Sequence, residues 1–481
     1  MNLRPEPGLT FDDVLLAPKH SPIRSRSEVD TSTWLVPGIR LRIPIASANM
    51  DTVTEAAMAI SMAQVGGIGF IHRFMSIERQ TEAVRRVKRA ESFVVEKPIT
   101  IEPKATLEEA RNKMVEADIG GLMVTDEEGH LLGLLTTRDI LLAPDDSHLV
   151  QSVMTARNRL VVAQADEPMD AARLELHAHR IEKLPLVDSE DRVVGLITAQ
   201  DIIKLQEHPH ATKDLKGRLR VGAAVGVRTP DFQRAAVCLE AGADLLLVDV
   251  AHGHSDHVCQ MVGFLKKEYP NVPIIAGNVA TSEGMRFLVD CGADAVKVGV
   301  GSGSICTTRI VTGFGVPQLS AIFDCAEIGN NLSVPVIADG GIRNSGDLTK
   351  ALAAGASTVM LGALLAGTDE SPGAGVVRNG RRYKVVRGMA SLTANIARKE
   401  IEKLGEVDPD EWESIIPEGV EALTPHRGAV KDILYQLVGG LRSGMSYAGA
   451  LTLDELWKSA EFIRITPAGQ QESGPHDVNV L

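Results

Sequence analysis

The sequence predicts an α/β fold, a (β/α)8 TIM barrel with a second domain inserted into it. A short apolar run followed by a helix-like segment occurs eight times, and this rhythm breaks once, where an internal repeat intervenes. Residues 245–248 are continuously apolar, as in a parallel strand covered on both faces, and residues 282–291 have the pattern of a covering helix. The predicted strands lie within residues 43–50, 66–72, 221–227, 244–251, 272–279, 295–303, 334–341 and 357–367.

The insertion falls between the second and third strands of the predicted barrel. Its two halves each read strand, helix, strand, strand, helix, which is typical of an internal duplication. Residues 98–101 and 133–139 of the first half parallel residues 160–162 and 195–201 of the second. The predicted parts are therefore residues 1–92 (barrel), 93–208 (insert) and 209–481 (barrel).

The composition excludes several function classes. The chain has 481 residues with 50 Lys and Arg against 63 Asp and Glu, and a net charge of −13 disfavours binding to nucleic acid or to an anionic membrane. No apolar run is long enough to cross a membrane, and the N-terminus has no signal segment, so we expect a cytoplasmic protein. Five cysteines without a CxxC pair favour a reducing compartment over a disulfide-stapled fold.

Residues 299–309 are rich in glycine and carry Cys306 among hydroxyl side chains, beside Arg309. Glycines let the backbone approach a ligand, and a nearby guanidinium favours the thiolate, which is the nucleophilic form of cysteine. A lone cysteine is more often a small buried hydrophobe. Because this segment follows the sixth predicted strand, and barrel chemistry lies at the carboxyl ends of the strands, we predict that Cys306 is a catalytic nucleophile.

Polar residues also follow other barrel strands, and we expect them around the same mouth. Residues 252–257 contain three histidines and an acid, which raises the alternative of a zinc site. Their spacing is not that of helical i, i+4 ligands, so contact with a cofactor or a plain helix start is the preferred interpretation. The predicted mouth residues are Asn49, His72, Asp249, Asn278, Asp339 and Gly362.

These features together resemble the inosine-monophosphate dehydrogenase and guanosine-monophosphate reductase family, over nearly the whole chain. The inserted repeat is similar to a tandem pair of cystathionine-β-synthase-type (CBS) modules. The family motifs, besides the cysteine segment, are residues 9–16, 50–53, 217–222, 339–341 and 387–389.

The resemblance implies that Cys306 attacks C2 of a purine mononucleotide and that the covalent intermediate exchanges a hydride with a nicotinamide cofactor. Asp339 would hold the ribose hydroxyls, and backbone amides would cradle the phosphate. Val386 stands where a dehydrogenase has a phosphate-binding tyrosine. The implied substrate residues are Ser304, Asn49, Asp339, Gly340, Gly341, Gly362, Ala363, Gly388 and Met389, and the implied cofactor residues are Asp249, Ser255 and Asn278.

The flap, at about residues 388–428, separates the two activities. A dehydrogenase carries an Asp-Arg-Tyr-Phe segment there to activate water, whereas this flap has no Arg-Tyr pair, and Arg398 is followed by Lys399. Thr308 and Glu418 match the pair with which a reductase protonates and expels the amine, although many dehydrogenases also have both. The sequence therefore favours a GMP reductase that uses NADPH. The alternative is an IMP dehydrogenase that uses NAD.

Some features point to the dehydrogenase. The C-terminal residues 471–478 are dehydrogenase-like, and in the family such a tail helps to bind a monovalent cation such as K⁺ at a neighbouring subunit's cysteine loop. Ser302 replaces the usual proline of that loop. NADH stays the alternative to NADPH as the cofactor of a reductase. The implied cation ligands are Gly301, Gly303, Cys306, Glu472, Ser473 and Gly474.

The resemblance also implies regulation by ATP- or GTP-type nucleotides at the CBS pair, and a homo-tetramer that pairs into an octamer. The residues for nucleotide binding would be Thr136, Asp139, Thr198 and Asp201. The alternative is that these aspartates only cap helices. A sensor or scaffold whose barrel has lost activity is a further alternative, against which the intact Cys306 argues.

Overall fold

The computed structural model contains a closed barrel of eight parallel strands, which confirms the predicted fold class. The structure describes residues 3–91, 94–95, 98–117, 119–143, 145, 148–165, 167–200, 202, 208–402 and 416–474. Each barrel strand lies inside a predicted apolar run. Around the barrel the strands are β13 (Gly222–Val225), β14 (Leu245–Asp249), β15 (Ile274–Val279), β16 (Ala295–Val298), β17 (Val336–Asp339), β18 (Thr358–Leu361), β4 (Ile45–Ser47) and β5 (Ile68–Ile71).

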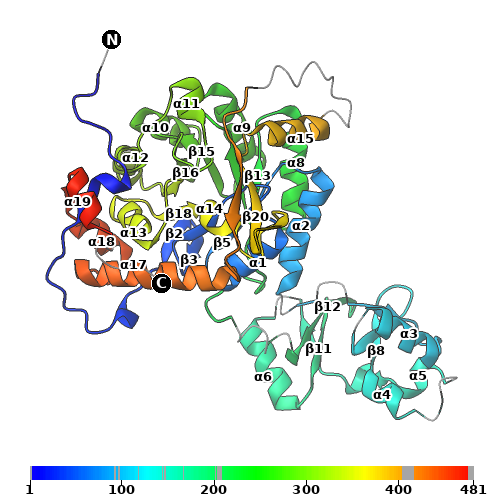
Figure 1. The fold of residues 1–481 in the computed structure, drawn as a ribbon. Helices are drawn as coiled ribbons and strands as arrows, with labels where there is room; N and C mark the ends of the chain where they lie inside the picture. Colours follow the sequence, from blue (N-terminus) through cyan, green and yellow to red (C-terminus); the bar gives the residue numbers. More distant parts are fainter. Residues whose placement is uncertain are drawn as a thin grey trace. The chain divides into compact units, whose positions relative to one another are not determined.

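Helices surround this barrel (Figure 1). The long helix α17 packs through buried Leu434, Leu437, Val438 and Leu441, whose spacing forms one apolar face. Within the described residues, no helix is both long and apolar enough to span a membrane. The main helices of this unit are α1 (Ala56–Gln64), α2 (Ile77–Ala90), α8 (Thr229–Glu240), α9 (Asp256–Glu268), α10 (Ser282–Asp290), α12 (Gln318–Leu332), α13 (Ser345–Ala353), α14 (Ala363–Ala366), α17 (Val430–Ala448), α18 (Leu453–Ser459) and α19 (Pro467–Glu472).

The period-two alternation of the strands divides the core. On β14, Leu246 and Val248 pack outward with the helices, whereas Leu245 and Leu247 face the barrel interior. A hairpin of β2 (Thr33–Val36) and β3 (Ile39–Leu41) adds its buried side chains to the interior cluster. The interior is therefore packed with apolar side chains, and polar groups gather where the strands end.

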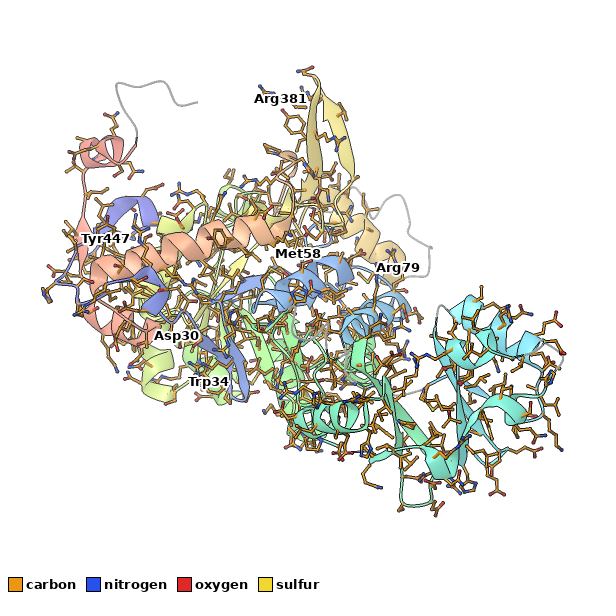
Figure 2. The ribbon with its side chains drawn as sticks, turned by 90° about the horizontal axis from the view of Figure 1, so that it is seen from below. Asp30, Trp34, Met58, Arg79, Arg381 and Tyr447 are labelled. Carbon is orange, nitrogen blue, oxygen red and sulfur yellow. A yellow bond between two sulfur atoms is a disulfide. The ribbon has the colours of Figure 1, made fainter. Side chains whose placement is uncertain are left out.

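A three-stranded antiparallel sheet follows α14 and leads into the flap. It consists of β19 (Gly375–Arg378), β20 (Arg381–Arg387) and β21 (Glu421–Pro425). Asn379 and Gly380 both have positive φ, as the tight turn between β19 and β20 requires. Figure 2 shows Arg381 at the tip of this hairpin. Helix α15 (Leu392–Glu402) begins the flap, and flap residues 403–415 lie outside the described residues.

A second compact unit comprises Arg89–Pro209 and Lys213–Arg218. Residues 213–218, which the sequence places with the barrel, therefore cluster with the insert. Leu160 and Val162, in the segment that parallels a strand of the first half, precede β10 and are not part of a β-strand. They pack on apolar residues of both halves. The first half holds β6 (Thr100–Ile101), α3 (Leu107–Ala117), β7 (Gly121–Thr125), β8 (Leu131–Thr136) and α4 (Thr137–Leu141), and the second holds β10 (Ala163–Gln164), α6 (Met169–His179), β11 (Lys183–Val187) and β12 (Val193–Thr198).

One disulfide departs from the expectation for a reducing compartment. Cys259 on α9 is bonded to Cys291, the residue that caps the end of α10. The two helices are consecutive in the barrel and pack side by side, so cysteines 32 positions apart in the sequence meet. Spatial neighbourhood of this kind leaves no short-range spacing signal such as CxxC.

We expect the double variant Cys259→Ser/Cys291→Ser to unfold more easily than the parent chain under oxidising conditions. Closing a loop of this length restricts the unfolded chain and contributes about 3–4 kcal/mol on the loop-entropy model. Denaturant unfolding of the full chain, followed through the transition of its barrel unit, measures this difference in the free energy of unfolding. A reductant should destabilise the parent protein to the same extent and leave the double variant unchanged, and equal stability of the two oxidised proteins would contradict the prediction.

Candidate active site

The cysteine loop runs from the end of β16 to α11 (Thr308–Thr312) in a conformation that requires glycine. Gly301 has φ +76°, and a Cβ on Gly299 would lie 2.0 Å from the carbonyl oxygen of Asp339. The Cys306 amide donates to the Gly303 carbonyl over 3.1 Å. Cys306 Sγ lies 3.1 Å from Thr308 Oγ1. A hydroxyl is thus held in hydrogen-bonding contact with the half-buried thiol.

The end of the flap packs directly on this loop. The Thr307 amide donates to the Glu418 carbonyl over 3.0 Å, and the Val420 amide donates to the Ile305 carbonyl over 3.0 Å. On its other side, the Glu418 amide donates to the Ala390 carbonyl over 2.9 Å. Residues 418–420 therefore lie between the cysteine loop and the start of the flap. This arrangement brings Glu418 to the same cavity as Cys306 and Thr308.

A buried lysine organises the strand ends beside the thiol. Lys297 on β16 is only 3% exposed, and its ammonium lies 2.8 Å from Asp249 Oδ1 and 2.6 Å from Asp339 Oδ2. Asn49 donates to Asp249 Oδ2 over 3.0 Å, and Asn278 donates to Asp339 Oδ2 over 3.0 Å. Lys297 is not among the residues predicted for the site, although it is the one charged residue in the strand 295–298.

The charges of this cluster stabilise each other. Burial by itself lowers the pKa of Lys297, but the carboxylates of Asp249 and Asp339 outweigh it and hold that pKa above its ordinary value. Burial raises the pKa of Asp249, but Lys297 and the Asn49 hydrogen bond bring it below its ordinary value. Both oxygens of Asp249 are bonded within the protein, whereas the bonds of Asp339 to Lys297 and Asn278, in the part of the chain that the structure describes, are both made by Oδ2 and leave Oδ1 to a ligand.

The cavity at the thiol has a volume of about 300 Å³. Asn278 Oδ1 is buried there and has no hydrogen-bond partner among the described residues, so it is an acceptor available to a ligand N–H group. The predicted residues that line this cavity are Asn49, Asp249, Asn278, Gly301, Gly303, Cys306, Thr308, Asp339, Gly340, Gly388, Met389 and Glu418; Arg73, Phe74, Lys297, Asn395 and Arg398 join them.

A second lobe of about 300 Å³ adjoins the first, because Met50, Ser302 and Asp339 line both. Three glycines lie in its wall, which leaves backbone open to a ligand there: Gly340 and Gly341 have positive φ, and Gly362 precedes the short helix α14. Exposed backbone amides of this kind suit an anionic group. The predicted residues that line it are Ser304, Asp339, Gly340, Gly341, Gly362 and Ala363, with Arg343, Thr424 and Arg427 in addition.

The other free cysteines do not compete with Cys306. Cys238 and Cys325 are fully buried, and burial raises the pKa of the Cys238 thiol to about 11 and that of Cys325 to about 12. A thiol with so high a pKa is a poor nucleophile near neutrality. Cys306 is half-buried and lines a cavity. Among the free thiols, it alone has the placement of a nucleophile.

A model of the IMP dehydrogenase / GMP reductase domain matches residues 8–476 of the chain. The chain belongs to the IMP dehydrogenase / GMP reductase family. Its relatives in this family carry both names. An inosine-5′-monophosphate dehydrogenase of Nitrosopumilus maritimus is 51% identical over 474 residues and covers 98% of this chain and 99% of its own. A GMP reductase of Leishmania donovani is 48% identical over 483 residues, with 98% of each chain covered.

Solved structures similar to this family member include GMP reductases. One from Trypanosoma brucei, in complex with guanosine 5′-monophosphate, has a TM-score of 0.88 and 46% identity and covers 98% of each chain. Another from the same organism, in complex with guanosine 5′-triphosphate, has a TM-score of 0.77 and 42% identity and covers 96% of this chain and 98% of its own. These similarities show the fold and the family. Because relatives of similar identity carry both names, the choice between the two activities depends on the residues of the site.

Not every residue that the family resemblance implied lies at the cavity. Ser255 is the N-cap of α9 and is not among the lining residues, and His72 is buried behind the mouth, with Nε2 3.5 Å from Glu55 Oε1. Glu472 is the last residue of α19 and Ser473 is its C-cap, and neither residue lines the cavity. Val386 is buried on β20 and offers no polar group.

The histidine segment of this family member is exposed at His252, His254 and His257. The His254 ring packs on Phe287, with ring centroids 4.7 Å apart. Within the described part of the chain, no group of three or more His, Cys, Asp or Glu side chains is arranged to hold a metal. A zinc site at this segment therefore has no structural support.

In the second unit, Thr136 and Asp139 bond to each other. The Asp139 carboxylate accepts from the Thr136 amide over 2.8 Å and from its hydroxyl over 2.7 Å, which is the helix-capping arrangement. Thr198 ends β12 in the corresponding place of the second half. Asp201 lies outside the described residues. Asp139 therefore caps helix α4 through one carboxylate oxygen, Oδ2, as the capping alternative expects. The other carboxylate oxygen takes no part in this cap.

Proposed function

We propose that this protein is a GMP reductase, which converts GMP, NADPH and two protons into IMP, NADP⁺ and ammonium. The observation that carries the proposal is the contact of Cys306 with Thr308 in a cavity that Glu418 of the flap also lines. The sequence of this flap contains no Arg-Tyr pair. An acid placed beside the thiol serves a leaving amine, whereas hydrolysis needs a base that activates water.

The residues account for each bond change. The Cys306 thiolate adds to C2 of the purine, and Thr308 with Glu418 delivers the proton with which the C2 amino group leaves as ammonia. NADPH, when bound, supplies the hydride that reduces C2 of the enzyme-bound purine. The C–S bond then breaks, which releases IMP and restores the thiolate for the next turnover. Asp339 Oδ1 accepts hydrogen bonds from the ribose and keeps C2 over the thiol.

The described residues fit both ligands. The Asn278 Oδ1 acceptor, which no donor in the described part of the chain bonds, suits a carboxamide N–H of nicotinamide or an N–H of the purine. Asp249, with both oxygens bonded, positions Asn49 and Lys297 and has less capacity to bind the cofactor itself. The complex of the Trypanosoma brucei enzyme with guanosine 5′-monophosphate supports GMP as the nucleotide.

The decisive assay follows absorbance at 340 nm in two mixtures. With GMP and NADPH we expect the absorbance to fall, with one ammonia released per NADPH consumed. With IMP and NAD we expect no sustained rise. A sustained rise with formation of xanthosine monophosphate would establish the dehydrogenase instead, for which the dehydrogenase-like tail and the 51% identical relative are the supporting observations.

Glu418→Gln should slow amine release by about 10²–10⁴-fold, because the amide cannot donate the proton. Hydride transfer should be affected much less. Mixing the variant with IMP and NADP⁺ isolates that step, since it produces one burst of NADPH per active site. Glu421→Gln, on the same segment, is the control and should retain both steps. An equal loss in both steps of Glu418→Gln would refute the assignment of Glu418 to the amine.

We further propose that adenosine or guanosine polyphosphates bind the second unit at Thr136, Asp139, Thr198 and Asp201 and alter the rate of the reaction. We also propose that K⁺ binds at the cysteine loop and that a homo-tetramer or octamer is the active assembly. Titration of ATP and GTP into the full chain tests the regulatory proposal. The rate should change with nucleotide in the parent protein and respond less in Thr136→Val. A rate independent of both nucleotides would exclude it.

A further inference from the structure

Arg427 lies at the second lobe of the cavity and is fixed there by its backbone. The Arg427 amide donates to the Gly367 carbonyl over 2.9 Å, and Gly428 pairs with Thr368 in a parallel bridge. A Cβ on Gly367 would lie 2.3 Å from the Pro425 carbonyl oxygen, so the two segments pack backbone against backbone. The loop after α14, the short helix that Gly362 of this lobe precedes, thus holds the main chain of Arg427 in place.

The cationic side chains of this lobe differ in whether they form ion pairs with carboxylates of the protein. Two cationic side chains line it, Arg343 and Arg427. Arg343 is bonded to two carboxylates, with Nη2 2.5 Å from Asp12 Oδ1 and Nε 2.9 Å from Asp347 Oδ2. Arg427 is exposed, and no carboxylate in the described part of the chain lies within ion-pair distance of it. The positive charge that the lobe offers to a ligand is therefore that of Arg427.

From this placement we infer that Arg427 recognises the 5′-phosphate of the bound purine nucleotide. A guanidinium forms paired, charge-assisted hydrogen bonds with a phosphate, and the Thr424 hydroxyl lines the lobe beside it. Val386, on the neighbouring strand β20, has no polar group to offer. Arg427 accordingly sets the preference for a nucleotide over the nucleoside.

This inference rests on the proposed purine-mononucleotide substrate but not on the choice between reductase and dehydrogenase, since GMP and IMP carry the same phosphate. Equilibrium binding therefore tests it without turnover. The dissociation constants of GMP, IMP and guanosine are measured by calorimetry for the parent protein, Arg427→Ala and Arg427→Lys. Arg381→Ala, at the exposed tip of the β19–β20 hairpin, is the control (Figure 2).

Arg427→Ala should weaken GMP and IMP binding by about 10- to 100-fold, the range for a lost charge-assisted hydrogen bond, and leave guanosine binding unchanged. Arg427→Lys should recover part of the affinity, and Arg381→Ala should bind like the parent protein. Equal losses for nucleotide and nucleoside, or no loss at all, would overturn the role of Arg427. Failure of the parent protein to bind any purine mononucleotide would overturn the proposed function as well.

Discussion

Replacing Cys306 by alanine is expected to abolish turnover, by at least about 10⁴-fold, with GMP and NADPH as well as with IMP and either oxidised cofactor. In the proposed mechanism both activities begin with the same bond from sulfur to C2, so no route remains once the sulfur is removed. Because alanine removes the thiol without filling the cavity, GMP should still bind. Stopped-flow absorbance and calorimetry on the same preparation measure the two effects.

Thiol labelling provides the control for this prediction. In the folded protein, iodoacetamide should modify Cys306 first, since Cys238 and Cys325 are buried with raised pKa values. GMP should protect Cys306 from the label. Residual turnover of Cys306→Ala near that of the parent protein, or faster labelling at another cysteine, would show that the chemistry does not proceed through this sulfur.

Lys297→Met is expected to damage both folding and activity. The substitution leaves the Asp249 and Asp339 carboxylates facing each other without a cation, and loss of one partner from a buried ion pair typically costs about 3–5 kcal/mol. Asn49 and Asn278 hydrogen-bond to these carboxylates, so substrate positioning should fail too. Denaturant unfolding and kcat/KM measure the two effects.

Two further variants distinguish charge from packing. Lys297→Met/Asp249→Asn removes one carboxylate as well and should recover part of the lost stability, though not the activity. Lys266→Met breaks a similar lysine–aspartate pair, with Asp294, whose side chains are 29% and 22% exposed, and should cost less. If Lys297→Met were as stable as the parent protein, the paired charges would contribute nothing to the fold.

The same cluster predicts how stability varies with pH. The raised pKa of Lys297 gives a contribution that is complete below the unfolded value of about 10.4 and is lost as the pH rises through the folded pKa. The lowered pKa of Asp249 gives a contribution that is complete above about 3.9 and is lost as the pH falls through the folded pKa. The contribution of this cluster should therefore be constant between about pH 4 and 10.

The site divides into what local sequence predicts and what it does not. Cys306 and Thr308 lie in one glycine-rich segment, so their proximity follows from the sequence. Lys297 was visible as a lone charge in an apolar strand, but its partners lie on β14 and β17. Ser255, a cofactor residue implied by the resemblance, is the N-cap of α9 and does not line the described cavity, so its contact with a cofactor stays a prediction. Strand-end position alone did not distinguish residues that face the cavity from those beside it.

The sequence by itself determined the barrel, its strand order along the chain and the cysteine loop, because apolar periodicity and glycine-rich turns are local properties of a chain. Only the tertiary structure decided that Lys297 joins Asp249 to Asp339, that residues 418–420 pack on the cysteine loop, that Cys259 meets Cys291, and that Arg427 reaches the second lobe. Each of these contacts joins residues from different strands, helices or loops. Their distances are set when the barrel closes, and no spacing along the chain encodes them.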